Sequence, residues 1–218
     1  MPSYYPVFLA LNERRCVIVG GGAEAERKTT GLLECGAKVT VISPDVTVGL
    51  HDMVSRGLID WEPREYQAGD LEGAFLVIAE NLDSNVYKAV AWEATRRGIL
   101  LNVVDTTDLC SFIAPAVVRR GDVTFAISTS GLSPALARRL REELENSSVM
   151  RWADIADLIS EVRLALRRMG VRPDPERWQE CMDNGLLDMF YSGRQAEAKE
   201  RLLEMLQSQP QATRKVHS

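Results

Sequence analysis

Residues 15–43 read RCVIVGGGAEAERKTTGLLECGAKVTVIS, and this stretch decides the fold. It opens with Arg15–Gly20, a run of β-branched residues that ends in glycine and predicts a buried strand. Residues 23–35 then follow the spacing of an amphipathic helix, which ends at Gly36. Lys38–Ser43 predicts a second buried strand. Two such strands joined by a helix are typical of a parallel sheet of the α/β type.

The same alternation continues as far as residue 112. Short apolar runs predict strands at residues 58–62, 74–79 and 99–104, with helices at residues 46–56 and 84–97 between them. Strands that are apolar along their whole length are typical of a parallel sheet covered by helices on both faces. The expected fold class is therefore α/β, with a Rossmann-type doubly wound parallel sheet.

The pattern changes after residue 112. Residues 112–128 predict a hairpin of two strands with its turn at Arg120–Asp122. Ser133 and Pro134 are typical of the N-cap and first position of a helix, which is expected over residues 134–145. The hairpin and this helix therefore form a small α+β segment.

Beyond Asn146 the chain is expected to be helical. Apolar residues at spacings of three and four predict one long helix; they are Trp152, Ile155, Ile159, Val162, Leu166 and Met169. Two shorter helices are expected at residues 176–183 and 194–206.

The composition excludes several classes of protein. Its 26 Lys and Arg residues stand against 31 Asp and Glu, and the net charge of -5 gives no general attraction to nucleic acid or an anionic membrane. The apolar runs are much shorter than the ~20 residues of a membrane helix. The chain has four cysteines without a C-x-x-C pair and only two histidines, so no histidine-rich metal site is expected. Without an export signal, we expect a soluble, cytoplasmic protein.

The glycine-rich turn carries the strongest functional signal. Residues 20–25 match G-x-G-x-x-A between a strand and a helix. Gly20 allows the tight turn, Gly22 lets the backbone approach a pyrophosphate, and Ala25 lets helix and strand pack closely. Free N–H groups at the start of the helix then face the phosphates. We expect a dinucleotide cofactor, although the pattern alone is also compatible with a simple tight turn.

The end of the second strand indicates which dinucleotide binds. An acidic residue is expected there for the ribose hydroxyls, and the sequence has Ser43, Pro44 and Asp45. Asp45 either accepts a hydrogen bond from the ribose or caps the helix that follows. No cation suited to a 2′-phosphate follows closely, since Arg56 lies a full helix away, and NAD is therefore favoured over NADP.

Three stretches together resemble a known family. They are VIVGGGAEAERKTTGLLECGAKVTVISP from Val17, NVVD from Asn102, and SFIAPAVVRRGDVTFAISTSGLSPALARRLRE from Ser111. They are similar to the dehydrogenase and ferrochelatase part of siroheme synthase. The similarity covers about residues 5–145 and continues more weakly into the helical end.

The resemblance implies oxidation of precorrin-2 to sirohydrochlorin with NAD, and in some members insertion of ferrous iron. It also implies a homodimer. The expected parts are then a NAD-binding Rossmann domain at residues 1–112, a dimerisation segment at 113–147 and a helical C-terminal domain at 148–218. The larger siroheme synthases carry a further methyltransferase domain, so we expect that this chain does not make its own precorrin-2.

The resemblance also assigns residues. Ala23 and Glu24 match the family's contacts at the pyrophosphate turn, and Pro44 with Asp45 match its second cofactor contact. Asp105 matches its catalytic aspartate. Two positions depart from the family: Thr129 stands where some members have a phosphorylated serine, and Ala79-Glu80-Asn81 replaces a small residue, Thr and an acid. Glu80 is an unusual neighbour for a cofactor.

Asp105 is the candidate base. It directly follows the predicted fifth strand, at the edge of the sheet where such folds bind ligands. Removing hydride from precorrin-2 requires loss of a proton as well, which a carboxylate can accept. The alternative is that Asp105 only turns its loop, in which case Asp108 is the next candidate.

The many carboxylates of precorrin-2 call for cations and free N–H groups. Candidate contacts are Ser128, Thr129, Ser130, Gly131, Arg119 and Arg138, with Arg120 and Arg139 beside them. For any single arginine, a solvated position on the helix face or at the hairpin tip is the favoured interpretation. Two other functions stay open: a non-enzymatic NAD-sensing regulatory domain, which needs neither Asp105 nor residues 128–134, and a dehydrogenase for a different small substrate.

Overall fold

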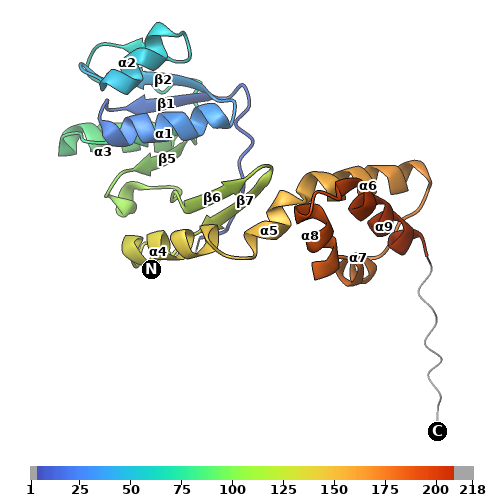
Figure 1. Ribbon diagram of the computed structural model, residues 1–218. Helices are drawn as coiled ribbons and strands as arrows, with labels where there is room; N and C mark the ends of the chain where they lie inside the picture. Colours follow the sequence, from blue (N-terminus) through green and yellow to red (C-terminus); the bar gives the residue numbers. More distant parts are fainter. Residues whose placement is uncertain (1–3, 209–218) are drawn as a thin grey trace. The chain divides into compact units, whose positions relative to one another are not determined.

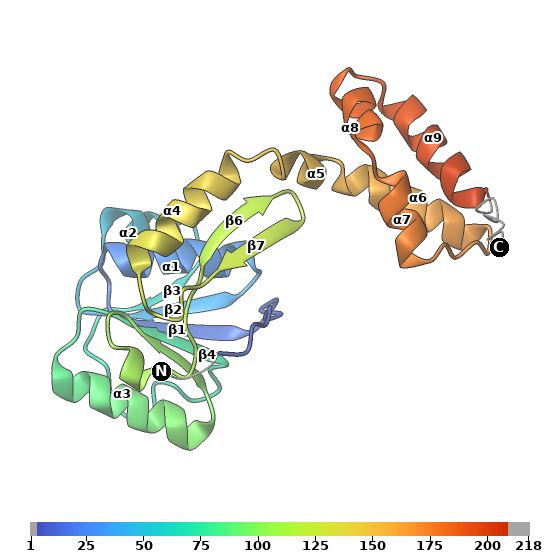
Figure 2. The same cartoon turned by 90° about the horizontal axis from the view of Figure 1, so that it is seen from below.

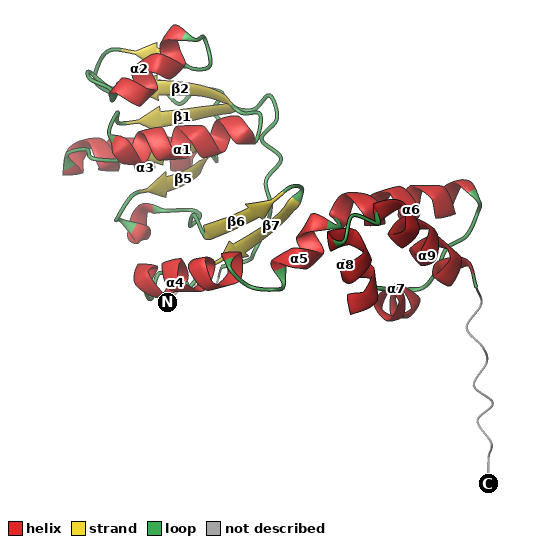
Figure 3. Cartoon of the chain, in the orientation of Figure 1, coloured by secondary structure: helices red, strands yellow, loops and turns green. Residues whose placement is uncertain are grey.

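The computed structural model describes residues 4–208, and the first half of the chain is built around a five-stranded parallel sheet. The strand order is β3-β2-β1-β4-β5. Figures 1 and 3 label β2, β1 and β5 of this sheet. The strands are β1 Arg15–Val19, β2 Lys38–Ile42, β3 Asp60–Glu62, β4 Leu76–Ala79 and β5 Leu100–Val103. The order reverses between β1 and β4, which is where doubly wound folds bind their ligands. The predicted Rossmann-type sheet is confirmed.

Helices cover both faces of this sheet. They are α1 Ala23–Glu34, α2 Val48–Ser55 and α3 Ser84–Arg97. Figure 2 shows α1 and α2 on one side of the strands and α3 on the other. Alternate residues of β1 belong to two separate cores: Cys16 and Ile18 pack with Ala25 of α1, whereas Val17 packs with Val90 of α3. This arrangement explains why the central strands are apolar at every position.

The carboxyl ends of four strands are aligned in register. Val19 of β1 pairs with Ile42 of β2 on one side and with Ala79 of β4 on the other, and Ala79 also pairs with Val103 of β5. The residues that follow these positions therefore meet at one edge of the sheet. Most of the cofactor and catalytic residues expected from the sequence belong to this edge.

The second half of the chain consists of a hairpin and a series of helices. The elements are β6 Ala116–Arg120, β7 Val123–Ile127, α4 Pro134–Glu145, α5 Met150–Asp154, α6 Ala156–Arg168, α7 Pro175–Cys181, α8 Asn184–Tyr191 and α9 Gln195–Gln207. β6 and β7 are antiparallel. A core among α6, α7, α8 and α9 is centred on the buried side chains of Val162, Leu186 and Leu202.

The long helix expected over the stripe from Trp152 to Met169 is interrupted at Ile155. The structure has α5 and α6 instead, with Ile155 at the junction in a non-helical conformation. The two pieces serve different cores: Met150 and Ala153 of α5 pack with Val118 of β6, whereas α6 packs with α9. The side-chain spacing alone does not reveal this change of partner.

Three further details differ from the expectation. Helix α8 was not predicted, because Asn184 and Gly185 resemble a turn, yet Asp183 caps the helix by accepting a hydrogen bond from the N–H of Leu186 at 2.9 Å. The first hairpin strand begins at Ala116 rather than at residue 112, because the carbonyl oxygen of Phe112 is bound by the side chain of Asn102. A short 3₁₀ helix, η1 Thr107–Leu109, follows β5.

The chain forms two compact units. Among the described residues, one contains 4–114 together with Ser128–Ser133, and the other contains Pro115–Ile127 together with 134–208. We expected three parts, at residues 1–112, 113–147 and 148–218, and this division stays a prediction. Residues 1–3 of the first part and 209–218 of the last lie outside the described residues. Across residues 4–208, every helix is too short or too polar to cross a membrane.

Candidate functional site

The turn after β1 leaves no room for a side chain at its first two glycines, and it is also tight at the third. Gly20 has a φ of +120°, a conformation that residues other than glycine rarely adopt. A Cβ at this position would also overlap the carbonyl oxygen of Glu80. A Cβ on Gly21 would overlap the carbonyl oxygen of Asp45. A Cβ on Gly22 would lie 2.8 Å from Oε1 of Glu80. The turn is therefore packed between the residues that follow β2 and those that follow β4.

Helix α1 begins directly after this turn and offers an anion site. Gly22 is its N-cap residue and has no side chain with which to cap it. Free N–H groups and the positive end of the helix dipole at such a terminus attract phosphate. In the structure the N–H of Gly22 donates to Oε1 of Glu80 at 2.7 Å. A carboxylate oxygen already sits in this position, so the glycine turn fits an anionic oxygen of a dinucleotide pyrophosphate.

Ala23 and Glu24 occupy the first turn of α1, where the family resemblance placed cofactor contacts. Ala23 is exposed. The carboxylate of Glu24 is engaged on the helix: Arg27 Nη2 lies 2.5 Å and Lys28 Nζ 3.5 Å from Oε1. The hydrogen bond from Arg27 lowers the pKa of Glu24. Its backbone N–H, rather than its side chain, is therefore the group suited to a phosphate.

The residues after β2 are held against the glycine turn. The Ser43 hydroxyl donates to the carbonyl oxygen of Asp45 at 2.7 Å, and Trp61 Nε1 donates to the carbonyl oxygen of Ser43 at 2.9 Å. The N–H of Thr47 donates to the carbonyl oxygen of Gly21 at 3.0 Å. These bonds fix the loop backbone and leave Pro44 and Asp45 exposed.

Asp45 does not cap the following helix. Thr47 is the N-cap residue of α2, and its hydroxyl accepts the N–H of Leu50 at 3.2 Å. The Asp45 carboxylate makes no hydrogen bond or ion pair within residues 4–208. The only arginine considered for a 2′-phosphate, Arg56, pairs with Asp52 at 3.3 Å. An exposed carboxylate without a neighbouring cation suits ribose hydroxyls and repels a 2′-phosphate, which fits NAD.

We expect Asp45→Ala to weaken NAD binding by roughly tenfold, because hydrogen bonds to a charged acceptor are lost. Binding of NADP should change less, so the preference for NAD should shrink. Isothermal titration of both dinucleotides measures this ratio. Asp60→Asn removes the same charge from an exposed position of β3 and serves as the control. An unchanged ratio in the Asp45 variant would assign the ribose contact to another residue.

Asp105 lies just beyond β5 in a left-handed conformation, with a φ of +58°. Its side chain is exposed, and in the part of the chain that the structure describes its carboxylate accepts no hydrogen bond. The loop around it is anchored by Cys110, whose sulfur accepts the N–H of Val103 at 3.1 Å and lies 3.4 Å from the carbonyl oxygen of Thr106. Asp105 therefore lies on a turn that is held in place by Cys110, and no hydrogen bond from its own loop occupies its carboxylate.

The expected substrate contacts are divided between the two compact units. Ser128, Thr129, Ser130 and Gly131 belong to the unit with the sheet, and Arg119 and Arg138 belong to the other. The Thr129 hydroxyl accepts the N–H of Ser133 at 3.2 Å, and Ser128 Oγ accepts the N–H of Ser130 at 3.0 Å. Arg138 pairs with Glu142 at 2.8 Å on the exposed surface of α4. Their roles in substrate binding stay predictions.

Sequence reasoning did not include two residues in the site. Glu80 was noted only as an unusual neighbour, and its contact with Gly22 became visible in the structure. Lys28 has a side chain that is only 14% exposed, and burial lowers its pKa. Its spacing from Ala25 and Leu32 on the buried face of α1 was the signal that identifies it.

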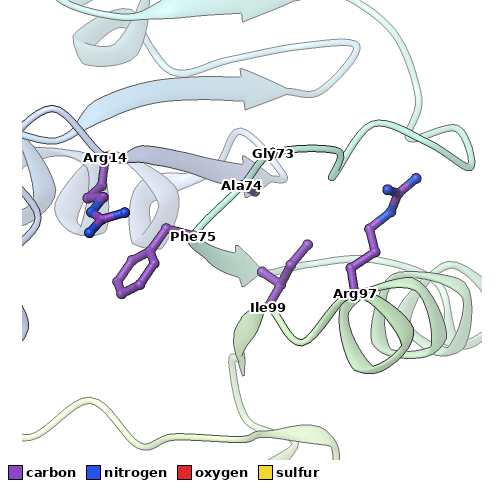
Figure 4. Close-up of a pocket in the computed structure, with 6 residues that line it drawn as sticks. All are labelled: Arg14, Gly73, Ala74, Phe75, Arg97 and Ile99. Atoms are coloured by element: carbon purple, nitrogen blue, oxygen red, sulfur yellow. The ribbon is translucent and has the colours of Figure 1, made fainter.

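A separate cavity of about 460 Å³ lies at the opposite edge of the sheet (Figure 4). Arg14, Phe75 and Ile99 line it, and each directly precedes a strand. The Arg14 guanidinium lies 5.1 Å from the centre of the Phe75 ring, so it is engaged in a cation–π contact. The glycine turn and Asp105 follow the strands and do not line this cavity.

Comparisons with known proteins agree with the site. Residues 7–116 match the family model described as putative NAD(P)-binding, and residues 120–147 match the sirohaem biosynthesis protein central model. The siroheme synthase of Methylococcus capsulatus is 40% identical over 93% of this chain, and that of Thioalkalivibrio sulfidiphilus is 35% identical over 94%. The chain covers only 43% and 42% of these two relatives.

Among solved structures, the precorrin-2 dehydrogenase SirC superposes with a TM-score of 0.70 and 25% identity. The match covers 93% of this chain and 98% of that protein. The matched family model includes the glycine turn, the Asp45 loop and Asp105. The chain therefore belongs to the NAD(P)-binding family that contains precorrin-2 dehydrogenase and the corresponding part of siroheme synthase, and its cofactor is NAD.

Proposed function

We propose that this protein oxidises precorrin-2 to sirohydrochlorin. The observation that carries the proposal is the position of Asp105, an exposed carboxylate with no hydrogen-bond partner among the described residues, at the edge of the sheet that also holds the glycine turn. The names of the relatives, siroheme synthase and precorrin-2 dehydrogenase, support the same reaction.

The reaction removes two hydrogens from the macrocycle, one as hydride and one as a proton. Bound NAD supplies the acceptor for the hydride. The hydride leaves a carbon–hydrogen bond, and the carboxylate of Asp105 accepts the proton of a nitrogen–hydrogen bond. The electron pair that this proton leaves behind forms the new double bond. The carboxylate then releases the proton to water. An exposed carboxylate is suited to this exchange because water reaches it directly.

The substrate presents a ring of carboxylates, which need cations and N–H donors. We assign this role to Ser128–Gly131, whose backbone turns sharply before α4, and to Arg119 and Arg138 of the hairpin and α4. The ion pair between Arg138 and Glu142 does not oppose this role, because solvent screens exposed pairs on a helix surface and makes them weak.

We also propose a homodimer in which residues 113–147 form the dimerisation segment and residues 148–218 a helical C-terminal domain. Helix α4 supports the dimer, because none of its residues is buried, while Leu136 and Leu140 are 49% and 41% exposed on the same helix face. A monomeric mass in solution would contradict this assembly.

We also propose a cytoplasmic location. The cysteines of the described residues are free thiols, which is consistent with it.

The decisive experiment supplies purified protein with precorrin-2 and NAD. We expect sirohydrochlorin to form with an equal amount of NADH, both followed by absorbance. The alternative of a non-enzymatic NAD sensor predicts NAD binding without turnover, and a dehydrogenase for another substrate predicts activity on compounds with few carboxylates. Adding ferrous iron to sirohydrochlorin in the same cuvette tests iron insertion, which the family resemblance alone suggests.

A further inference from the structure

Glu80 follows β4 and lies directly on the glycine turn. Its N–H donates to the carbonyl oxygen of Val19 at 3.0 Å, which continues the sheet beyond the end of the two strands. Its side chain turns toward α1, and Oε1 accepts the N–H of Gly22 at 2.7 Å. The residue is only 6% exposed.

This buried carboxylate has no cation as a partner. Across residues 4–208, Glu80 forms no ion pair, and its one side-chain hydrogen bond comes from Gly22. A buried acid normally needs an opposite charge or several donors. Here the compensation comes from the Gly22 N–H and from the positive end of α1, which begins at the next residue. These are the groups that a dinucleotide-binding turn offers to the pyrophosphate.

We propose that Glu80 is a built-in competitor for the pyrophosphate position of the NAD site. One N–H cannot satisfy two anions, so the Glu80 carboxylate has to leave Gly22 before a phosphate oxygen binds there. Oε1 of Glu80 lies 2.7 Å from the Gly22 nitrogen, which is the position that a phosphate oxygen would take. Glu80 thereby lowers the affinity for NAD and promotes release of the cofactor.

The competition concerns the diphosphate alone. Adenosine carries no phosphate and has no need of the Gly22 N–H, so its binding does not require Glu80 to move. ADP carries the diphosphate and needs the same position as NAD. The inference rests on the NAD assignment and is independent of the tetrapyrrole substrate, because binding is measured without it.

The test is titration of NAD, ADP and adenosine into wild type and Glu80→Gln. Glutamine keeps the size and one acceptor oxygen but removes the charge. We expect the Kd for NAD and for ADP to fall roughly tenfold, the size of effect typical of a charge-assisted hydrogen bond that no longer has to be broken. The Kd for adenosine should stay the same.

Two further variants make the result decisive. Glu80→Thr removes the charge with a smaller side chain and should tighten binding in the same direction, which covers a failure of the glutamine variant to fold. Glu176→Gln removes an exposed carboxylate from α7, in the other compact unit, and should leave all three affinities unchanged. Melting temperatures without ligand identify any variant that is poorly folded.

The inference is overturned if NAD binds the Glu80 variants no more tightly than wild type, because Glu80 is then a cofactor ligand or a structural residue. It is also overturned if adenosine gains as much affinity as ADP, since the variant then opens the site in general. Tighter NAD binding combined with absent precorrin-2 oxidation by wild type would leave this inference intact and remove the proposed function instead.

Discussion

Replacing Asp105 with Asn is expected to lower kcat for precorrin-2 oxidation by about 10²–10⁴-fold, the usual contribution of a general base. Asparagine is the appropriate substitute because Asp105 has a φ of +58°, a conformation that Asn tolerates and most other residues do not. It preserves the shape of the loop and removes only the capacity to accept a proton. The measurements are the rate of sirohydrochlorin formation and, separately, the Kd for NAD, which should stay within about twofold.

Asp108→Asn provides the matched control. Asp108 lies in η1, three residues further along the same loop, and it is also exposed. Its loss should leave kcat nearly unchanged. If Asp108→Asn is inactive while Asp105→Asn retains full activity, the base has been assigned to the wrong carboxylate. If both retain full activity, proton removal does not depend on this loop.

The sheet was predictable because its signals are local. Each strand is a short apolar run, and each helix between them carries its own spacing and its own end, so no long-range information was needed to recognise a doubly wound fold. The glycine turn was also recognisable from the sequence, since Gly20, Gly22 and Ala25 follow the G-x-G-x-x-A spacing of dinucleotide-binding turns. The order of the strands was not predicted and comes from the structure.

The role of Glu80 was not readable from the sequence. An acid after a buried strand predicts only a residue at the edge of the sheet. Its contact with Gly22 joins residues 58 positions apart and depends on β1 and β4 being neighbours with Val19 opposite Ala79. The interruption at Ile155 has a similar origin, because it depends on which of two cores each half of the helical stripe joins. In both cases tertiary packing decides what local sequence leaves open.

The cap of helix α2 is a different case, because here the local sequence contains a capping signal but at two positions. Asp45 and Thr47 are both good capping residues, and sequence alone does not choose between them. The structure chooses Thr47 because its hydroxyl also donates to the carboxylate of Glu26 at 2.5 Å, which ties α2 to α1. Asp45 is left exposed, as its proposed contact with the ribose requires.

Replacing Gly21 with Ala is expected to weaken NAD binding by roughly 10- to 100-fold, equivalent to the ~1–3 kcal/mol cost of forcing a methyl group into a packed site. The added Cβ would overlap the carbonyl oxygen of Asp45 and push the loop after β2 away from the turn. Gly31→Ala is the matched control, because a Cβ at this position in α1 meets nothing within 4 Å and should stabilise the helix by up to ~1 kcal/mol. Titration with NAD and thermal unfolding separate the two effects. Retention of wild-type NAD affinity by Gly21→Ala would mean that the cofactor does not use the close approach between this turn and the Asp45 loop.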